Sequence, residues 1–284
     1  MCAMSNIHPT AIVSPGAQIP ASATVGPWCT VGANVVLGEA VRLLSHVVLA
    51  GDDTGKLTIG RGSTIYPFAC LGIAPQDLKY AGEPTACTIG EHTTIREYVT
   101  ISRGTTGGGG TTTVGDRCLI MAYTHIGHDS HIGNHCILAN SATLAGHVTV
   151  EDYATVGALC PVHQFCRIGR HAYIGGGTTI TQDVLPYSLT SIERNNHAYG
   201  LNKVGLERRG FTPEQLKALR SAYRLLQHSK LNTTEALAAI RALVEPTESA
   251  SRAASDAAPL DAATAEHVRY LADFIASSDR GVIK

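Results

Sequence analysis

Histidines gather near the middle of the chain beside one aspartate. They are His125, His128, His147 and His163, and Asp129 directly follows His128. An imidazole that donates one ring N–H to a carboxylate can accept a proton from a hydroxyl at its other nitrogen. Histidines on neighbouring segments could instead bind zinc. The residue types alone therefore leave a general base and a metal site both open.

A six-residue repeat must position these histidines, because an aliphatic residue recurs at every sixth place over nearly two thirds of the chain. The anchors are Ile7, Val13, Ile19, Val25, Val31, Leu37, Leu43, Leu49, Ile59, Ile65, Leu71, Ile89, Ile95, Ile101, Val114, Ile120, Ile126, Ile132, Leu138, Leu144, Val150, Val156, Val162, Ile168, Ile174 and Ile180. The residue four places later is usually small, and five cysteines at this place are expected to be interior residues. They are Cys29, Cys118, Cys136, Cys160 and Cys166.

Six residues make one strand and one turn, a unit too small to bury its own face. Three such units predict a triangular coil of 18 residues, with successive coils about 4.8 Å apart. The predicted fold is mostly β, with a parallel β-helix over residues 1–190. Polar, glycine-rich or proline-containing segments at 72–88 and 102–113 interrupt the repeat, and we expect projecting loops there.

Helical signals replace the repeat after Pro186, and they predict a C-terminal α-helical domain over 191–284. Thr212 before Pro213 is typical of a helix start, and a second helix is expected after Asn232. A last helix is expected over about 261–277, where apolar residues return with helical spacing.

Stacking arithmetic locates a candidate site, since residues 18 apart are vertical neighbours in such a coil. His128 then lies under Gly146 and Gln164, while Asp129 lies under His147. The repeat therefore brings the histidines and the aspartate to one edge of the prism. Corner positions accept any polar residue, so the other corner histidines are expected to be merely solvated. These are His92, His135 and His171.

Composition excludes several classes of protein. The formal net charge of −1 gives no basic field for nucleic acid. No apolar run is long enough to span a bilayer, and the N-terminus has no secretory pattern, so we expect a cytoplasmic protein. The eight cysteines form no C-x-x-C pair.

Six internal motifs identify a family. They are PQDLKYAGEPT (75–85), IREYVTISRGT (95–105), HIGHDSHIGN (125–134), ILANSATLAGHV (137–148), VHQF (162–165) and GLNKVGLERRGF (200–211). Together with the final DRGVIK, they closely resemble the UDP-N-acetylglucosamine O-acyltransferases of lipid A synthesis, over essentially the whole chain. The resemblance implies a left-handed β-helix and transfer of a 3-hydroxyacyl group from acyl carrier protein to the sugar 3-hydroxyl.

The resemblance also implies roles for single residues. His128 would be the general base, Asp129 would orient it, and the N–H of Gly146 would hold the oxyanion. Gly176 matches the position that limits acyl length, and its missing side chain suggests room for a longer chain. Val204 stands where many relatives have a glutamate near the uracil. The resemblance therefore implies no contact of this kind with the uracil at Val204.

Substrate binding is implied for nine further residues. Those expected to hold the sugar and its phosphates are Asp77, Lys79, His125 and His147. Those matching the acyl-phosphopantetheine side are His163 and Gln164. Those matching the nucleotide-binding segment are Asn202, Arg208 and Arg209.

The resemblance further implies a homotrimer with active sites between subunits and no cofactor or metal, because the acyl carrier protein brings its own phosphopantetheine.

Three alternatives remain. The related UDP-glucosamine N-acyltransferase normally has an extra domain before its coils, whereas this repeat starts at Ile7. An enzyme of the same fold could use the 3-amino sugar as acceptor. A structural or zinc-binding β-helix, such as the γ-class carbonic anhydrases, would leave the 75–85 and 200–211 motifs unexplained.

Overall fold

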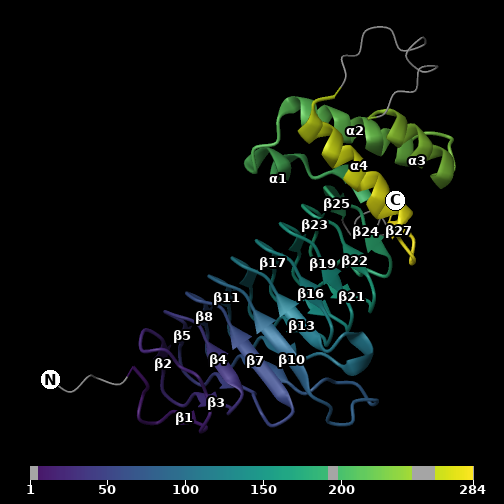
Figure 1. Cartoon of the computed structure of the whole chain (residues 1–284). Helices are drawn as coiled ribbons and strands as arrows, with labels where there is room; N and C mark the ends of the chain where they lie inside the picture. The colour runs from purple at the N-terminus through teal and green to yellow at the C-terminus, as the bar shows by residue number, and fades with distance from the viewer. Residues whose placement is uncertain (1–5, 191–197, 245–259, 284) are drawn as a thin grey trace.

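The computed structural model describes residues 6–190, 198–244 and 260–283. In them the chain winds into a three-sided prism, and each coil lays one short strand on each of three sheets (Figure 1). Strands on successive coils pair in parallel, and the partner of Ile12 is Thr30, 18 residues on, as the partner of Ile126 is Leu144. The fold is the predicted left-handed parallel β-helix followed by helices, and that prediction is confirmed.

Each face of the prism is one sheet. Sheet A contains β2 (Thr24–Val25), β5 (Arg42–Leu43), β8 (Thr64–Ile65), β11 (Thr94–Ile95), β14 (Leu119–Ile120), β17 (Ile137–Leu138), β20 (Thr155–Val156), β23 (Tyr173–Ile174), β25 (Ser188–Thr190) and β26 (Ala198–Leu201). Sheet B contains β1 (Ile12–Val13), β3 (Thr30–Val31), β6 (Val48–Leu49), β9 (Cys70–Ile73), β12 (Thr100–Ser102), β15 (His125–Ile126), β18 (Thr143–Leu144) and β21 (Pro161–Val162).

Sheet C is the third face. It contains β4 (Val35–Leu37), β7 (Gly55–Ile59), β10 (Thr85–Ile89), β13 (Thr111–Val114), β16 (His131–Ile132), β19 (Thr149–Val150), β22 (Arg167–Ile168), β24 (Asp183–Val184) and β27 (Val282–Ile283). We name the edges of the prism by the sheets that meet there, as the AB, BC and CA edges.

The repeat anchors form the core. From Val25 onward they are buried, and all five cysteines predicted to be interior residues are buried as well. Burial raises the pKa of the Cys29, Cys160 and Cys166 thiols. These cysteines therefore act as small apolar residues rather than as reactive thiols.

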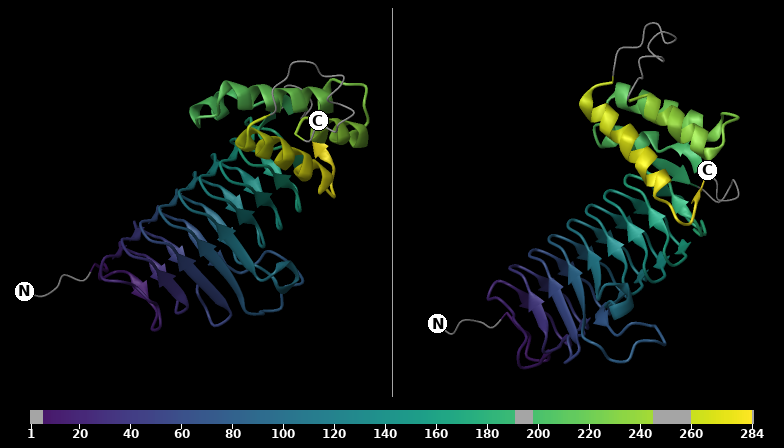
Figure 2. Two further views of the ribbon diagram at one scale, coloured as in Figure 1. Left: turned by 45° about the horizontal axis from the view of Figure 1, so that its top comes forward. Right: turned by 45° about the vertical axis from the view of Figure 1, so that its right-hand side comes forward.

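Within residues 6–190, extra residues enter the coils at one edge. β6 and β7, β9 and β10, and β12 and β13 are joined by the segments 50–54, 74–84 and 103–110, and all three lie at the BC edge, from which the two longer ones project (Figure 2). The strands extend into both predicted loops, which are therefore shorter than the expected 72–88 and 102–113. The first insertion, 50–54, was not among the loops predicted from the repeat.

The C-terminal part covers the last coils of the prism (Figures 1 and 2). It contains α1 (Lys203–Arg208), α2 (Pro213–Gln227), α3 (Thr233–Ala242) and α4 (Ala262–Ala276). Thr212, Asn232 and Asp261 cap the three long helices through their side chains, which explains where those helices begin. β26 pairs with β25 and β27 with β24, so both ends of this part extend sheets of the prism.

No helix in the described ranges is long and apolar enough to cross a membrane.

Candidate active site

His128 and Asp129 lie at the BC edge, in the corner between β15 and β16. Nδ1 of His128 is 2.8 Å from Oδ2 of Asp129. The Asp129 side chain is fully buried, whereas 15% of the His128 side chain is exposed. An ionised carboxylate only accepts hydrogen bonds, so Nδ1 carries the proton and Nε2 can accept one. The imidazole is thus accessible to a substrate, while its carboxylate partner is shielded from solvent.

The Asp129 carboxylate is held from its other side by Thr105. The Thr105 N–H donates to Oδ1 at 2.8 Å, and the Thr105 hydroxyl donates to Oδ2 at 2.7 Å. Burial alone would raise the pKa of Asp129, but the hydrogen bonds from His128 and Thr105 outweigh it and lower the pKa below its usual value. The carboxylate therefore remains ionised beside the imidazole.

Gly146 lies one coil from His128, as the stacking predicted. A Cβ at Gly146 would lie 2.7 Å from both Cε1 and Nε2 of His128. Only glycine therefore allows the imidazole to keep its present position. Among the described residues, nothing accepts a hydrogen bond from the Gly146 N–H. This N–H is available to donate to an oxyanion.

His147 completes the cluster on the next coil. Its ring stacks on Phe165 with centroids 4.5 Å apart and meets the His128 ring edge-on at 5.0 Å. Nε2 of His147 is 3.9 Å from Oδ2 of Asp129. Burial lowers the pKa of His147, although the charges of Asp129 and Asp77 oppose this effect. A neutral imidazole here can both donate and accept a hydrogen bond.

His125 lies on β15, directly before the corner that holds His128. Its Nδ1 is 2.8 Å from Oγ1 of Thr100 on the neighbouring coil. Burial, and then the nearby His128, lowers the pKa of His125. His125 therefore presents a neutral ring on sheet B close to the edge.

His163 and Gln164 lie exposed at the same edge, in the corner between β21 and β22. Nδ1 of His163 is 3.3 Å from the guanidinium of Arg280, which also donates to the Thr181 carbonyl. The C-terminal segment thus reaches back to the BC edge. Sequence reasoning missed Arg280, although it lies in the final DRGVIK.

The projecting segment 74–84 carries Asp77 and Lys79. Lys79 is exposed and donates its N–H to Oδ1 of Asp77 at 3.0 Å. Tyr80 anchors the segment, because its hydroxyl is 2.8 Å from the guanidinium of Arg103. Arg103 is 2% exposed and also donates to Thr54 at 2.8 Å. Arg103 directly follows the last residue of β12 and lies outside the six-residue repeat. The repeat therefore gave no reason to expect it in the site.

Asn202, Arg208 and Arg209 lie elsewhere, at the CA edge. Asn202 caps α1 and donates to the His171 carbonyl at 3.1 Å, and the Arg209 guanidinium lies 4.5 Å from the Tyr153 ring centroid. Arg208 is exposed at the end of α1, and Val204 on the same helix is 57% exposed. Sheet C separates this edge from the His128 edge within one chain.

The expectation that His171 is merely solvated is wrong. Its ring stacks between Tyr153 and Tyr187 along the CA edge, with Phe211 edge-on. Burial, and then the charges of Arg209 and Arg170, lowers its pKa to about 3. His171 is therefore a neutral packing residue. His92 is exposed, as expected.

Gly176 lies at the third edge, AB, above Ala158. A Cβ there would have its nearest contact 3.3 Å away, at the Ala158 carbonyl oxygen. The side chain of Leu159 beside it is 68% exposed. A larger side chain at Gly176 would therefore extend along the surface rather than into the core.

Three residues are close enough to share a metal ion. One ligand atom each from His128, Asp129 and His147 lies within 4.8 Å of the others. Both Asp129 oxygens already accept hydrogen bonds from Thr105, and Oδ2 also pairs with His128. Zinc at Oδ2 would have to displace one of the two donors, from Thr105 or His128, that already bond to this oxygen. The arrangement fits a histidine base oriented by a carboxylate better than a zinc centre.

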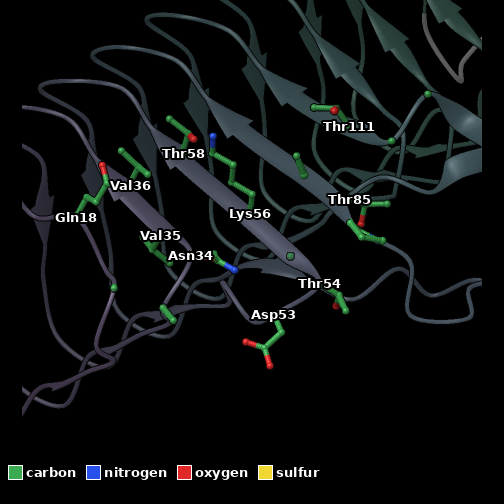
Figure 3. A pocket seen from close by; sticks show the side chains of 17 residues that line it. Gln18, Asn34, Val35, Val36, Asp53, Thr54, Lys56, Thr58, Thr85 and Thr111 are labelled. Carbon is green, nitrogen blue, oxygen red and sulfur yellow. The ribbon is translucent and has the colours of Figure 1, made fainter.

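A polar groove of about 910 Å³ lies on sheet C, toward the N-terminal coils (Figure 3). Its lining includes Asn34, Lys56, Thr58 and Thr85, and it ends against Gly109 and Gly110 of the glycine-rich segment. None of the clustered imidazoles lines it. The His128 cluster therefore lies at the BC edge, outside this groove.

Comparisons with known proteins cover both parts of the chain. Residues 183–283 match the family described as Udp N-acetylglucosamine O-acyltransferase, Domain 2, and residues 111–146 match the bacterial transferase hexapeptide family. A protein of Herminiimonas arsenicoxydans named acyl-(acyl-carrier-protein)–UDP-N-acetylglucosamine O-acyltransferase is 45% identical over 99% of this chain and 100% of its own length. One of the same name from Thermodesulfovibrio yellowstonii is 49% identical over 82% of this chain and 89% of its own.

A solved structure is similar over nearly the whole length. The Francisella novicida UDP-N-acetylglucosamine acyltransferase superposes with a TM-score of 0.87, at 36% identity, over 98% of this chain and 93% of its own. The likeness includes the prism and the C-terminal helices.

Proposed function

The chain belongs to the UDP-N-acetylglucosamine O-acyltransferases and is an acyltransferase, and we propose that it transfers a 3-hydroxyacyl group from acyl carrier protein to the 3-hydroxyl of UDP-N-acetylglucosamine. This is the first step of lipid A synthesis, and we place it in the cytoplasm. The observation that carries the mechanism is the partly exposed His128, bonded through Nδ1 to a buried carboxylate and lying beside Gly146.

The reaction needs one base and one oxyanion donor. Nε2 of His128 takes the proton of the sugar 3-hydroxyl, and the oxygen attacks the thioester carbonyl. The N–H of Gly146 donates to the oxyanion of the tetrahedral intermediate. When the intermediate collapses, the carbon–sulfur bond breaks. The departing phosphopantetheine thiolate then receives from His128 the proton that came from the sugar hydroxyl. Asp129 stabilises the imidazolium between these two steps, and no metal or external cofactor is required.

The remaining residues bind the two substrates. Asp77, Lys79, His125 and His147 hold the sugar and its phosphates around the catalytic corner. His163 and Gln164 line the acyl-phosphopantetheine side. Asn202, Arg208 and Arg209 hold the nucleotide, and arginine suits its phosphates because the planar guanidinium donates hydrogen bonds in pairs.

We propose that the active site lies between subunits of a homotrimer. His128 and Arg209 lie at different edges of one chain, on either side of sheet C. A cyclic trimer brings the CA edge of one subunit toward the BC edge of the next and makes three equivalent sites. A neighbouring subunit would also cover the open edge at which His128 is exposed.

Mixing two inactive variants tests this arrangement. His128→Ala and Arg209→Ala, each nearly inactive alone, are unfolded together and refolded as mixed trimers. If each site takes His128 from one subunit and Arg209 from another, about a quarter of the sites regain both wild-type residues in a random equal mixture. Initial rates of thiol release from acyl carrier protein measure the recovery. If each site took His128 and Arg209 from the same chain, no activity would return, and homotrimers mixed without unfolding are the control.

Gly176→Met tests the acyl-chain end of the site. The new side chain lies on the AB surface, where the glycine leaves room, so we expect the preferred acyl chain to become shorter. The measurement is the ratio of kcat/KM values over a series of 3-hydroxyacyl thioesters, for which wild type is expected to favour longer chains. An unchanged preference would show that the acyl chain does not reach Gly176.

A further inference from the structure

Asp129 is covered by the glycine-rich segment 103–110, which contains the one-turn helix η1 (Thr106–Gly108). Thr105 is 5% exposed, and it bonds to both carboxylate oxygens of Asp129. Oδ2 receives the hydroxyl of Thr105 on one side and Nδ1 of His128 on the other. Thr105 is therefore the next member of a hydrogen-bonded chain that begins at the imidazole.

Two glycines let the segment approach this closely. A Cβ at Gly108 would lie 2.1 Å from Cγ of Asp129, and a Cβ at Gly104 would lie 2.8 Å from its Oδ1. Neither glycine has a positive φ, so close approach rather than backbone freedom requires them. At Gly108 the missing side chain admits the carboxylate, whereas a Cβ at Gly104 would meet the Thr111 backbone nitrogen first, at 2.2 Å.

The segment is also fixed at both ends. At its far end the Gly110 carbonyl accepts from the Ala86 N–H at 2.8 Å, while the Thr105 carbonyl closes the turn by accepting from the N–H groups of Gly108 and Gly110. At the start of the segment, Arg103 is buried and bonded to Thr54 and Tyr80. The position of Thr105 is therefore set by the surrounding loops rather than by Asp129 alone.

We propose that Thr105 is a positioning residue for acyl transfer, which holds the Asp129 carboxylate in the one orientation that keeps the proton of His128 on Nδ1. This proposal rests on the proposed function, in which Nε2 of His128 is the base. An ionised carboxylate has no donor of its own, and it needs fixed donors to keep its orientation when it is buried. Thr105 supplies two of them.

Thr105→Val removes only the hydroxyl donor, since valine has nearly the same shape and keeps the backbone N–H. We expect kcat to fall roughly 10- to 100-fold, the size of effect found for groups that orient metal-binding histidines, with little change in KM for UDP-N-acetylglucosamine. Without the hydroxyl the Asp129 pKa rises. The acidic fall of kcat/KM that follows protonation of the Asp129 carboxylate then moves to higher pH. Thr105→Ser keeps the donor and is expected to restore both the rate and the profile.

Gly108→Ala and Gly107→Ala form a matched pair in the same turn. The Cβ added at Gly108 collides with Asp129, whereas the Cβ added at Gly107 meets no heavy atom nearer than 4.0 Å. We expect Gly108→Ala to lose activity and Gly107→Ala to keep it. Thermal midpoints of both variants show whether the loss comes from unfolding.

The outcomes separate this proposal from the proposed function. Wild-type rates and pH profile in Thr105→Val, with His128→Ala inactive, would overturn the role of Thr105 and leave the base in place. An active His128→Ala would remove both. A Thr105→Val variant with lower activity but an unshifted pH profile would show a merely structural role and would also overturn the proposal.

Discussion

His128→Ala is expected to lower kcat/KM roughly 10²- to 10⁴-fold, the usual contribution of a positioned general base. The variant keeps the Asp129 carboxylate and its bonds to Thr105 but has no group to take the proton of the sugar hydroxyl. The loss should lie in kcat, because His128 contributes its main interaction in the transition state. Steady-state rates of thiol release from the acyl carrier protein measure it.

The control is His8→Ala, which removes an exposed imidazole in the first coil and is expected to leave the rate unchanged. Full activity in His128→Ala would rule out the proposed mechanism. A loss of the same size in His8→Ala would show that the assay reports stability rather than catalysis.

Gly146→Ala is the second large effect, with an expected fall in kcat of roughly 10²- to 10³-fold, the usual effect of removing an oxyanion donor. The added Cβ would lie 2.7 Å from Nε2 of His128, so either the imidazole or the Gly146 backbone must move. Either the base or the oxyanion donor is then misplaced. KM for UDP-N-acetylglucosamine should change much less than kcat.

Gly107→Ala is a suitable control for this variant, because it also adds one methyl group at the BC edge but into free space. Alanine keeps the backbone N–H, so equal rates in Gly146→Ala and wild type would show that the reaction does not depend on the close packing of Gly146 against His128. A lower thermal midpoint with normal kcat would assign Gly146 a packing role only.

The sequence predicted the fold well because the repeat directly reports the core. Each anchor faces the interior, and a coil of three units has a fixed length, so vertical neighbours follow by counting. From Val114 to Ile180 the anchors keep the six-residue spacing, which is why the stacking of Gly146 on His128 and of His147 on Asp129 could be predicted. Before Val114 the insertions at the BC edge break the count.

The rest depended on contacts that the repeat does not report. Thr105 reaches Asp129 because an insertion folds back over the corner, and its path depends on the anchoring of Arg103. Likewise, β26 pairs with β25, and this pairing places Asn202 and Arg209 at the CA edge. The six-residue repeat has ended before β26, so it could not predict this placement. Motif resemblance pointed to Asn202 and Arg209 without saying at which edge they lie.

The most direct test of the central claim is the structure of the product. Purified protein is incubated with UDP-N-acetylglucosamine and a 3-hydroxyacyl thioester of acyl carrier protein, and the acylated sugar is analysed by NMR. We predict an ester at the sugar 3-oxygen and one carrier thiol released for each ester formed. Acylation of the 3-amino analogue alone, or no thiol release with UDP-N-acetylglucosamine, would contradict this account.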